Sequence, residues 1–134
     1  MAASKKYTYA IGRRKSSSAR VRLFKGKGES TVNGKKVNVY FPGKINEKAI
    51  NKPFEITETQ GKFYFTAKIV GGGKIGQLDA LVHGISRTLN ALKPEKYRKD
   101  LKKAGLLTRD SRVRLRRMVG MGGKSRRKRQ SPKR

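Results

Sequence analysis

The amino-acid sequence predicts an α+β domain followed by a basic C-terminal tail. In the first 70 residues, apolar residues alternate with polar or small ones, as they do in half-buried β-strands. The strongest helical patterns come later, in residues 75–92 and 94–105. Strands that pair as hairpins and meanders, with most of the helices after them, are typical of the α+β class.

Residues 7–11, 19–23 and 63–69 each alternate as a half-buried strand does. In the second of these segments, aliphatic residues alternate with Arg20 and Arg22. Because side chains along a strand point to opposite faces in turn, both arginines should lie on one face and the aliphatic residues on the other. We therefore expect a sheet with one dry face and one cationic face.

The dipeptide Asn33-Gly34 is the clearest hairpin signal in the chain. A type I′ turn needs positive φ at both central residues, which asparagine and glycine tolerate. The flanking segments are Thr31-Val32 and the alternating residues 37–41, so the sequence predicts a hairpin whose second strand ends at Pro42-Gly43.

Helical spacing predicts a short helix over residues 44–52, with Ile45 and Ala49 on one side and Pro53 limiting it. A longer helix carries one apolar stripe that should face the sheet, formed by Ile75, Leu78, Val82, Ile85, Leu89 and Leu92. Its opposite side carries Asp79, His83, Arg87 and Asn90. A last helix opens at Pro94 and has Gly105 as its expected C-terminal cap.

The chain of 134 residues has 36 Lys and Arg against 8 Asp and Glu, a formal charge of +28. Residues 109–134 hold twelve of the cations and one acid, Asp110, which leaves the first 108 residues at about +17. Such a charge predicts a dense polyanion as partner, and nucleic acid is the first candidate. No apolar run approaches the roughly 18 residues of a membrane span, and no basic stretch has a wide apolar helical face, so no membrane partner is expected. The lack of cysteine excludes disulfides and thiolate metal sites and fits a cytoplasmic protein.

Three segments follow from this composition: a flexible N-terminus at residues 1–6 without the apolar core of a signal peptide, a globular domain at 7–108 and a tail at 109–134. The tail has too few apolar residues to form a core and carries three loosening glycines. Fully extended, it would reach about 90 Å. We expect it to remain disordered until a polyanion orders it, with the domain as its anchor.

Gly71, Gly73 and Gly76 match the pattern G-x-G-x-x-G between a strand and a helix. A dinucleotide-binding unit needs a hydrophobic strand after that helix, whereas Pro94 opens another charged helix. Two interpretations stay open. Either the glycines serve only close packing of helix on sheet, or the loop and Lys74 contact a phosphate of an RNA backbone. Gly123-Lys124-Ser125 ends like a P-loop, but Met118 stands where the first glycine belongs.

Asp79, His83 and Ser86 include the residue types of a hydrolase triad on successive helical turns. They would have to share a pocket that nothing in the sequence indicates, and His83 is the only histidine. We expect no catalytic residue, metal site or cofactor. A solvated or RNA-facing side of the helix, with an Asp79–His83 pair at i,i+4, is favoured instead.

Several stretches resemble one family, the bacterial-type ribosomal protein nine of the small subunit. The match covers residues 7–117 nearly in register, and its motifs are Tyr9–Val21, Asn33-Gly34 with Tyr40-Phe41, Gly71–Gln77, His83–Arg87 and Ala104–Asp110. The resemblance implies a sheet backed on one side by two helices, as in the second domain of ribosomal protein five, with a left-handed βαβ crossover. It also implies a place in the subunit head on the 3′ major domain of its rRNA, beside ribosomal proteins seven, ten and fourteen.

In this family the tail approaches the anticodon stem-loop of the P-site tRNA, and the matching residues here are Lys133 and Arg134. The rest of the tail departs from the family, because residues 129–134 read Arg-Gln-Ser-Pro-Lys-Arg where Pro-Gln-Phe-Ser-Lys-Arg is usual. Leu115 and Val82 also stand where an acid and an arginine are common.

The leading hypothesis is a non-enzymatic, rRNA-binding structural protein, with no DNA partner expected. Its tail lacks aromatic residues and should read phosphate positions and RNA shape rather than stack bases. The predicted rRNA contacts are Arg13, Arg14, Lys15, Arg20, Arg22, Lys74, Arg87, Arg109, Arg112, Arg116, Arg117, Arg126 and Arg127. Two alternatives are a nucleic-acid packager, such as a nucleoid protein, and the protein part of a tRNA-maturing ribozyme.

Overall fold

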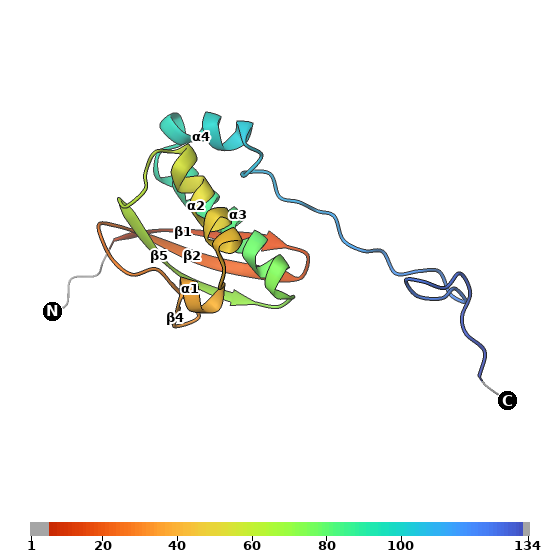
Figure 1. Ribbon diagram of the computed structural model, residues 1–134. Coiled ribbons are helices and arrows are strands. Elements are labelled where there is room, and N and C mark those ends of the chain that lie inside the picture. Colours follow the sequence, from red (N-terminus) through yellow and green to blue (C-terminus); the bar gives the residue numbers. More distant parts are fainter. Residues whose placement is uncertain (1–5, 133–134) are drawn as a thin grey trace.

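The computed structural model describes residues 6–132 and has a five-stranded mixed sheet with helices on one face (Figure 1). The strands lie in the order β1-β2-β5-β3-β4, and every neighbouring pair is antiparallel except β3 and β5. This confirms the α+β class. The strands are β1 Tyr7–Arg14, β2 Ser17–Lys25, β3 Thr31–Val32, β4 Lys35–Lys36 and β5 Phe63–Val70; the helices are α1 Val37–Tyr40, α2 Lys44–Ile56, α3 Lys74–Leu92 and α4 Pro94–Lys103.

The central strand β2 separates a dry face from a cationic face, as its alternation predicts. Ala19, Val21 and Leu23 are buried beneath the helices, whereas Arg20 and Arg22 are exposed on the other side of the sheet. Pairing with β1 and β5 continues both faces across the sheet. The basic turn between the first two strands is shorter than expected, because β1 runs to Arg14 and β2 begins at Ser17.

Helix α3 lies directly on β1 and β2, and α2 and α4 pack against α3. Phe54 of α2 also stacks on Phe65 of β5, with ring centroids 6.4 Å apart, so helices α2 and α3 both contact the sheet, and α4 covers α3. The closest approach is at Gly12 of β1, where a Cβ would lie 2.7 Å from the Cα of Gly84 and closer still to the carbonyl oxygen of Ala80. Glycine is required at position 12 for α3 to reach this depth, because the atoms that a Cβ would meet there belong to the backbone.

The Asn33-Gly34 hairpin is confirmed, with φ of 52° and 80° at its two central residues. The asparagine side chain also donates to the carbonyl of Ile69 at 3.0 Å and accepts from its N–H at 2.8 Å, which ties the turn to β5. The strand expected over residues 37–41 is wrong. A helical turn, α1, puts Val37 and Tyr40 against the core and buries Phe41, leaving Val39 exposed.

The helix expected over residues 44–52 continues through Pro53 to Ile56. Pro53 is buried together with Ile50 and Phe54, and this packing offsets the loss of a helical N–H. Ile45, expected on the apolar side, is instead 84% exposed.

The apolar stripe predicted for α3 is partly correct. Ile85 and Leu89 are fully buried, but Ile75 in the first turn is 80% exposed. The buried surface is wider than a stripe and includes Ala80 and Leu81, because α3 is covered by the sheet on one side and by α2 and α4 on others.

Helix α4 ends at the expected cap, where Gly105 has φ of 76° and the N–H of Leu106 donates to the carbonyl of Leu101. Leu106 and Leu107 are partly buried against the core. Beyond them the described chain leaves the domain without a further helix or strand, apart from an isolated bridge between Met121 and Lys128 (Figure 1). Within residues 6–132, no helix is long and apolar enough to cross a membrane.

Candidate RNA interface and tail anchor

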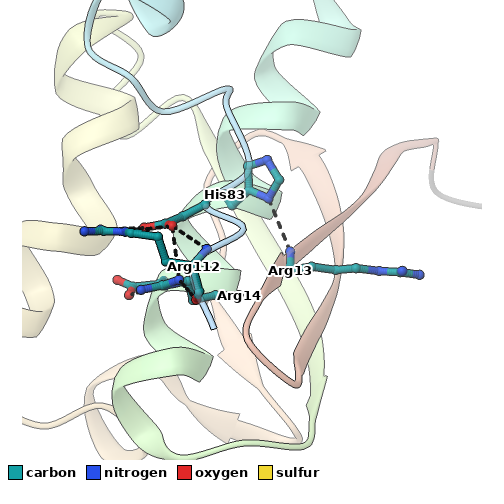
Figure 2. Close-up of polar contacts among 6 residues, drawn as sticks. Arg13, Arg14, His83 and Arg112 are labelled. Atoms are coloured by element: carbon teal, nitrogen blue, oxygen red, sulfur yellow. Dashed lines mark hydrogen bonds and ion pairs between the residues drawn. The ribbon is translucent and has the colours of Figure 1, made fainter. Parts of the chain in front are cut away.

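Arg14, at the end of β1, ties the sheet to α3 and to the start of the tail. Its guanidinium lies 3.6 Å from a carboxylate oxygen of Asp79 and 3.2 Å from one of Asp110. It also donates to the main-chain carbonyl of Arg112 at 2.8 Å. The Arg14 side chain is 14% exposed and is held by one hydrogen bond and two ion pairs (Figure 2).

The next contact of this cluster lies within the tail itself. The guanidinium of Arg112 donates to both carboxylate oxygens of Asp110, at 3.0 and 2.7 Å, and its backbone N–H donates to the same carboxylate at 3.0 Å. These two sets of hydrogen bonds, in that order, hold the pKa of the Asp110 carboxyl well below its usual range, and the charge of Arg14 adds to the effect. The hydrogen bonds to Asp110 and its charge in turn raise the pKa of Arg112.

His83 of α3 connects the same two regions. Its Nδ1 accepts from the backbone N–H of Arg13 at 3.2 Å, and its Nε2 lies 3.2 Å from the carbonyl of Leu107. The ring must therefore be neutral with its proton on Nε2, which donates to that carbonyl. Burial lowers the pKa of His83, the hydrogen bond to Leu107 opposes this, and the charges of Arg87 and Arg109 add to the lowering. We call Arg14, Asp79, His83, Asp110 and Arg112 the tail anchor.

The expected Asp79–His83 pair is wrong, since each residue bonds elsewhere: Asp79 to Arg14, and His83 to main-chain groups. Ser86 is buried and donates to the carbonyl of Val82. The three residues share no site, and in the part of the chain that the structure describes no group of His, Cys, Asp or Glu could hold a metal ion.

The cationic face of the sheet carries no helix (Figure 1). A shallow groove of about 950 Å³ runs across it, lined by aromatic, basic and neutral side chains without an acid. Tyr9 and Arg22 lie opposite each other in the β1–β2 register, and Arg20 lies opposite Lys68 of β5. The alternation of Tyr7 and Tyr9 in the sequence indicates that both lie on one face of the sheet. Only the strand pairing shows that this is the face that carries Arg20 and Arg22.

The family model described as Ribosomal protein S9/S16 matches residues 12–134 of this chain. The chain is 48% identical over 120 residues to small ribosomal subunit protein uS9 of Maridesulfovibrio salexigens, covering 90% of this chain and 92% of that protein. The chain belongs to the ribosomal protein S9/S16 family. It is also 46% and 45% identical over 112 residues to the uS9 proteins of Pseudarthrobacter chlorophenolicus and Cutibacterium acnes, covering 84% of this chain and 67% and 65% of those proteins. Membership in a family of ribosomal proteins confirms the expectation of a non-enzymatic protein.

In this S9/S16 chain, the glycine loop before α3 has a packing role. Gly71 and Gly72 have φ of 78° and 65°, and the hydroxyl of Ser17 donates to the carbonyl of Gly71 at 3.1 Å. A Cβ on Gly76 would lie 3.2 Å from the same hydroxyl. Lys74 lies over the ring of Tyr40, 3.5 Å from its centroid, so its ammonium already has a partner within the fold. The phosphate contact of this loop stays a prediction.

The other predicted RNA contacts fall into separate regions of the S9/S16 chain. Arg87 donates to the carbonyl of Ile11 at 2.6 Å, and thereby holds β1 to α3. Arg14 and Arg112 belong to the tail anchor, a role that sequence reasoning missed although Asp110 is the single acid of the tail. The remaining body and tail cations are exposed, namely Arg13, Lys15, Arg20, Arg22, Arg109, Arg116, Arg117, Arg126 and Arg127. Lys133 and Arg134 lie outside the described residues.

Proposed function

We propose where this chain, a structural constituent of the small ribosomal subunit, binds within that subunit. Its domain binds the 3′ major domain of the rRNA in the subunit head, and its tail reaches the anticodon stem-loop of the P-site tRNA. The relatives named small ribosomal subunit protein uS9 support the assembly, and the formal charge of +28 supports the polyanionic partner. The proposed neighbours are ribosomal proteins seven, ten and fourteen.

The observation that carries the proposal is the tail anchor at the root of an exposed cationic segment. Arg14 pairs with Asp110, and Arg112 closes on the same carboxylate, so the direction in which the tail leaves the domain is set by side-chain contacts. Residues 111–121 are exposed beyond this point. A tail that begins at a fixed place can deliver its end to a chosen phosphate with less loss of entropy than a freely swinging one.

Binding follows from electrostatics. Each Lys or Arg that neutralises an RNA phosphate releases condensed counterions, so affinity should fall steeply as salt rises. The domain at residues 7–108 docks first, and residues 109–134 become ordered within the RNA. The finer features proposed with this function are the similarity of the fold to the second domain of ribosomal protein five and a left-handed crossover from β3 through α1 and α2 to β5.

The test of the tail is deletion of Lys133 and Arg134. Small subunits reconstituted with the shortened protein should assemble normally but release P-site tRNA faster. A matched control replaces Lys35 and Lys36 of the β4 edge with glutamine, which removes the same charge from the domain. Unchanged tRNA release in the deletion would contradict the role of the tail end.

The test of the assembly is co-sedimentation. In high salt the full chain should sediment with small subunits and not with DNA. Neither a nucleoid packager nor a ribozyme subunit should sediment with small subunits. Recovery of the protein with DNA, or faster cleavage of precursor tRNA on its addition, would contradict the assignment.

A further inference from the structure

The open face of the sheet combines two features that RNA recognition uses. Its β1–β2–β5 register places side chains in cross-strand rows: Tyr7, Phe24 and Tyr64; Tyr9, Arg22 and Thr66; and Ile11, Arg20 and Lys68. Aromatic side chains therefore occupy one end and cations the middle. Neighbouring rows are about 7 Å apart along the strands, because two residues rise by that distance.

The aromatic end is partly used within the fold. Phe24 stacks on Tyr64 with ring centroids 5.1 Å apart, Tyr7 packs against Phe24 at 5.7 Å, and Arg22 lies 5.1 Å from the centre of the Tyr7 ring. Tyr9 differs from these residues. It is 45% exposed, and among residues 6–132 no ring or cation packs on it.

The cations of this face have no acidic partner among residues 6–132. Among the described residues, no ion pair involves Arg20, Arg22 or Lys68, and the groove that they line contains no acid. A face with this charge fits an anion. The open ring of Tyr9 beside Arg22 fits a planar group attached to that anion, and a base with its phosphate supplies both.

We propose that this face binds an unpaired segment of RNA, with one base stacked on Tyr9 and the flanking phosphates on Arg20, Arg22 and Lys68. The inference rests on the proposed function and specifies which surface of the domain meets the rRNA and which form of RNA it selects. A double helix keeps its bases stacked inside and would offer the tyrosine no face, so the surface should prefer single strands. Stacking on an aromatic residue is tolerant of sequence, and we expect little preference among bases.

The first experiment measures the affinity of the full-length protein for a single-stranded oligonucleotide and for a duplex of equal length. The variant Tyr9→Thr removes the ring and keeps a residue that suits a strand, and Tyr9→Phe keeps the ring. At raised salt, where phosphate contacts weaken, Tyr9→Thr should bind the single strand roughly 5- to 100-fold more weakly, and Tyr9→Phe should bind as the unaltered protein does. Duplex affinity should not change in either variant.

The second experiment separates stacking from charge. Arg20→Gln should reduce the slope of log affinity against log salt by about 0.7 for a single strand, because one phosphate contact is lost. Tyr9→Thr should leave that slope unaltered. Lys48→Gln removes an exposed cation from α2, in the helical layer, and serves as the control for net charge.

Circular dichroism of each variant establishes that the fold is retained. Equal loss of single-strand and duplex affinity in Tyr9→Thr, or no loss of either, would overturn the proposal. The unaltered protein could still co-sediment with small subunits in that case, so failure of this surface is distinguishable from failure of the proposed function. Photocrosslinking of Tyr9 to an unpaired rRNA nucleotide in assembled subunits would support the proposal directly, and crosslinks confined to the helical layer would contradict it.

Discussion

Replacing Gly12 with alanine should lower the free energy of unfolding of the domain more than any other single methyl addition in the sheet. The added Cβ would lie within 3.0 Å of three backbone atoms of α3: the carbonyl oxygen of Ala80 and the nitrogen and Cα of Gly84. Backbone atoms cannot turn aside as a side chain can, so helix and strand must separate by about 1 Å. Overpacking of a core costs about 1–3 kcal/mol, and occasionally more, and we place this substitution at or above the upper end.

The reciprocal substitution, Gly84→Ala, should be milder. Its Cβ would meet a methyl group of Val21 at 2.7 Å and the nitrogen of Gly12 at 3.2 Å, which a small shift can relieve. Alanine also stabilises a helix by about 1 kcal/mol relative to glycine, and this gain offsets part of the loss. Gly73→Ala serves as the control, since nothing lies within 4 Å of its added Cβ and its φ is −97°.

Urea unfolding followed by circular dichroism measures the three free energies of unfolding. At roughly 4–8 °C per kcal/mol for a domain of this size, a loss of about 3 kcal/mol lowers Tm by about 12–24 °C for Gly12→Ala. The close-contact argument would be refuted if the free energy of unfolding of Gly12→Ala lay within about 1 kcal/mol of the unaltered protein. It would also be refuted if Gly84→Ala were less stable than Gly12→Ala.

The tail anchor supports two predictions. Arg112→Gln should raise the pKa of the Asp110 carboxyl more than Arg14→Gln does, because the hydrogen bonds of Arg112 are the larger cause of the depressed pKa. NMR titration of the carboxyl carbon in both variants measures the two pKa values, and the opposite order would contradict the prediction. The pKa of His83 in the folded protein lies below 6.5, its value in the unfolded chain. The free energy of unfolding should therefore be fully retained above pH 6.5. It should decrease as the pH falls from 6.5 to the folded-state pKa, because protons bind the unfolded chain first. His83→Gln should remove this loss between pH 6.5 and the onset of carboxylate protonation near pH 4, and an unaltered pH profile would count against the role of His83.

Local patterns predicted the parts of the fold that local forces decide. The strand alternation of Ala19, Val21 and Leu23 fixed the two faces, and the positive-φ requirement located the turn at Asn33 and Gly34. Residues 37–41 alternate as well, yet they form a helical turn. Helical spacing brings Val37, Tyr40 and Phe41 to the core together, and the Tyr40 hydroxyl donates to Gln77 of α3 at 2.7 Å. That contact joins segments 37 residues apart, which no short window can contain.

The candidate site was predicted in composition but not in arrangement. Counting charges was enough to indicate a polyanion, and alternation was enough to put Arg20 and Arg22 on one face. The separate role of Arg14 could not be found in this way, because its hydrogen-bond acceptor on Arg112 is 98 residues distant. A guanidinium in a basic run is usually solvated, and only the fold distinguishes the one that is 14% exposed from its neighbours.

The single acid of the tail explains why the tail of so highly charged a chain starts at a defined place on the domain. A domain of about +17 repels a segment of Lys and Arg, and without compensation the tail would leave in any direction that increased its distance. Asp110 lies at the root of the segment and meets Arg14, whose position is set by β1, and His83 holds the carbonyl of Leu107 three residues earlier. Repulsion between the tail and the domain then favours directions away from the sheet for the exposed residues after Arg112, whose starting point is held by these contacts. The cations of the domain and of the tail therefore repel one another beyond the anchor, while the contacts of Asp110 hold the start of the tail beside β1.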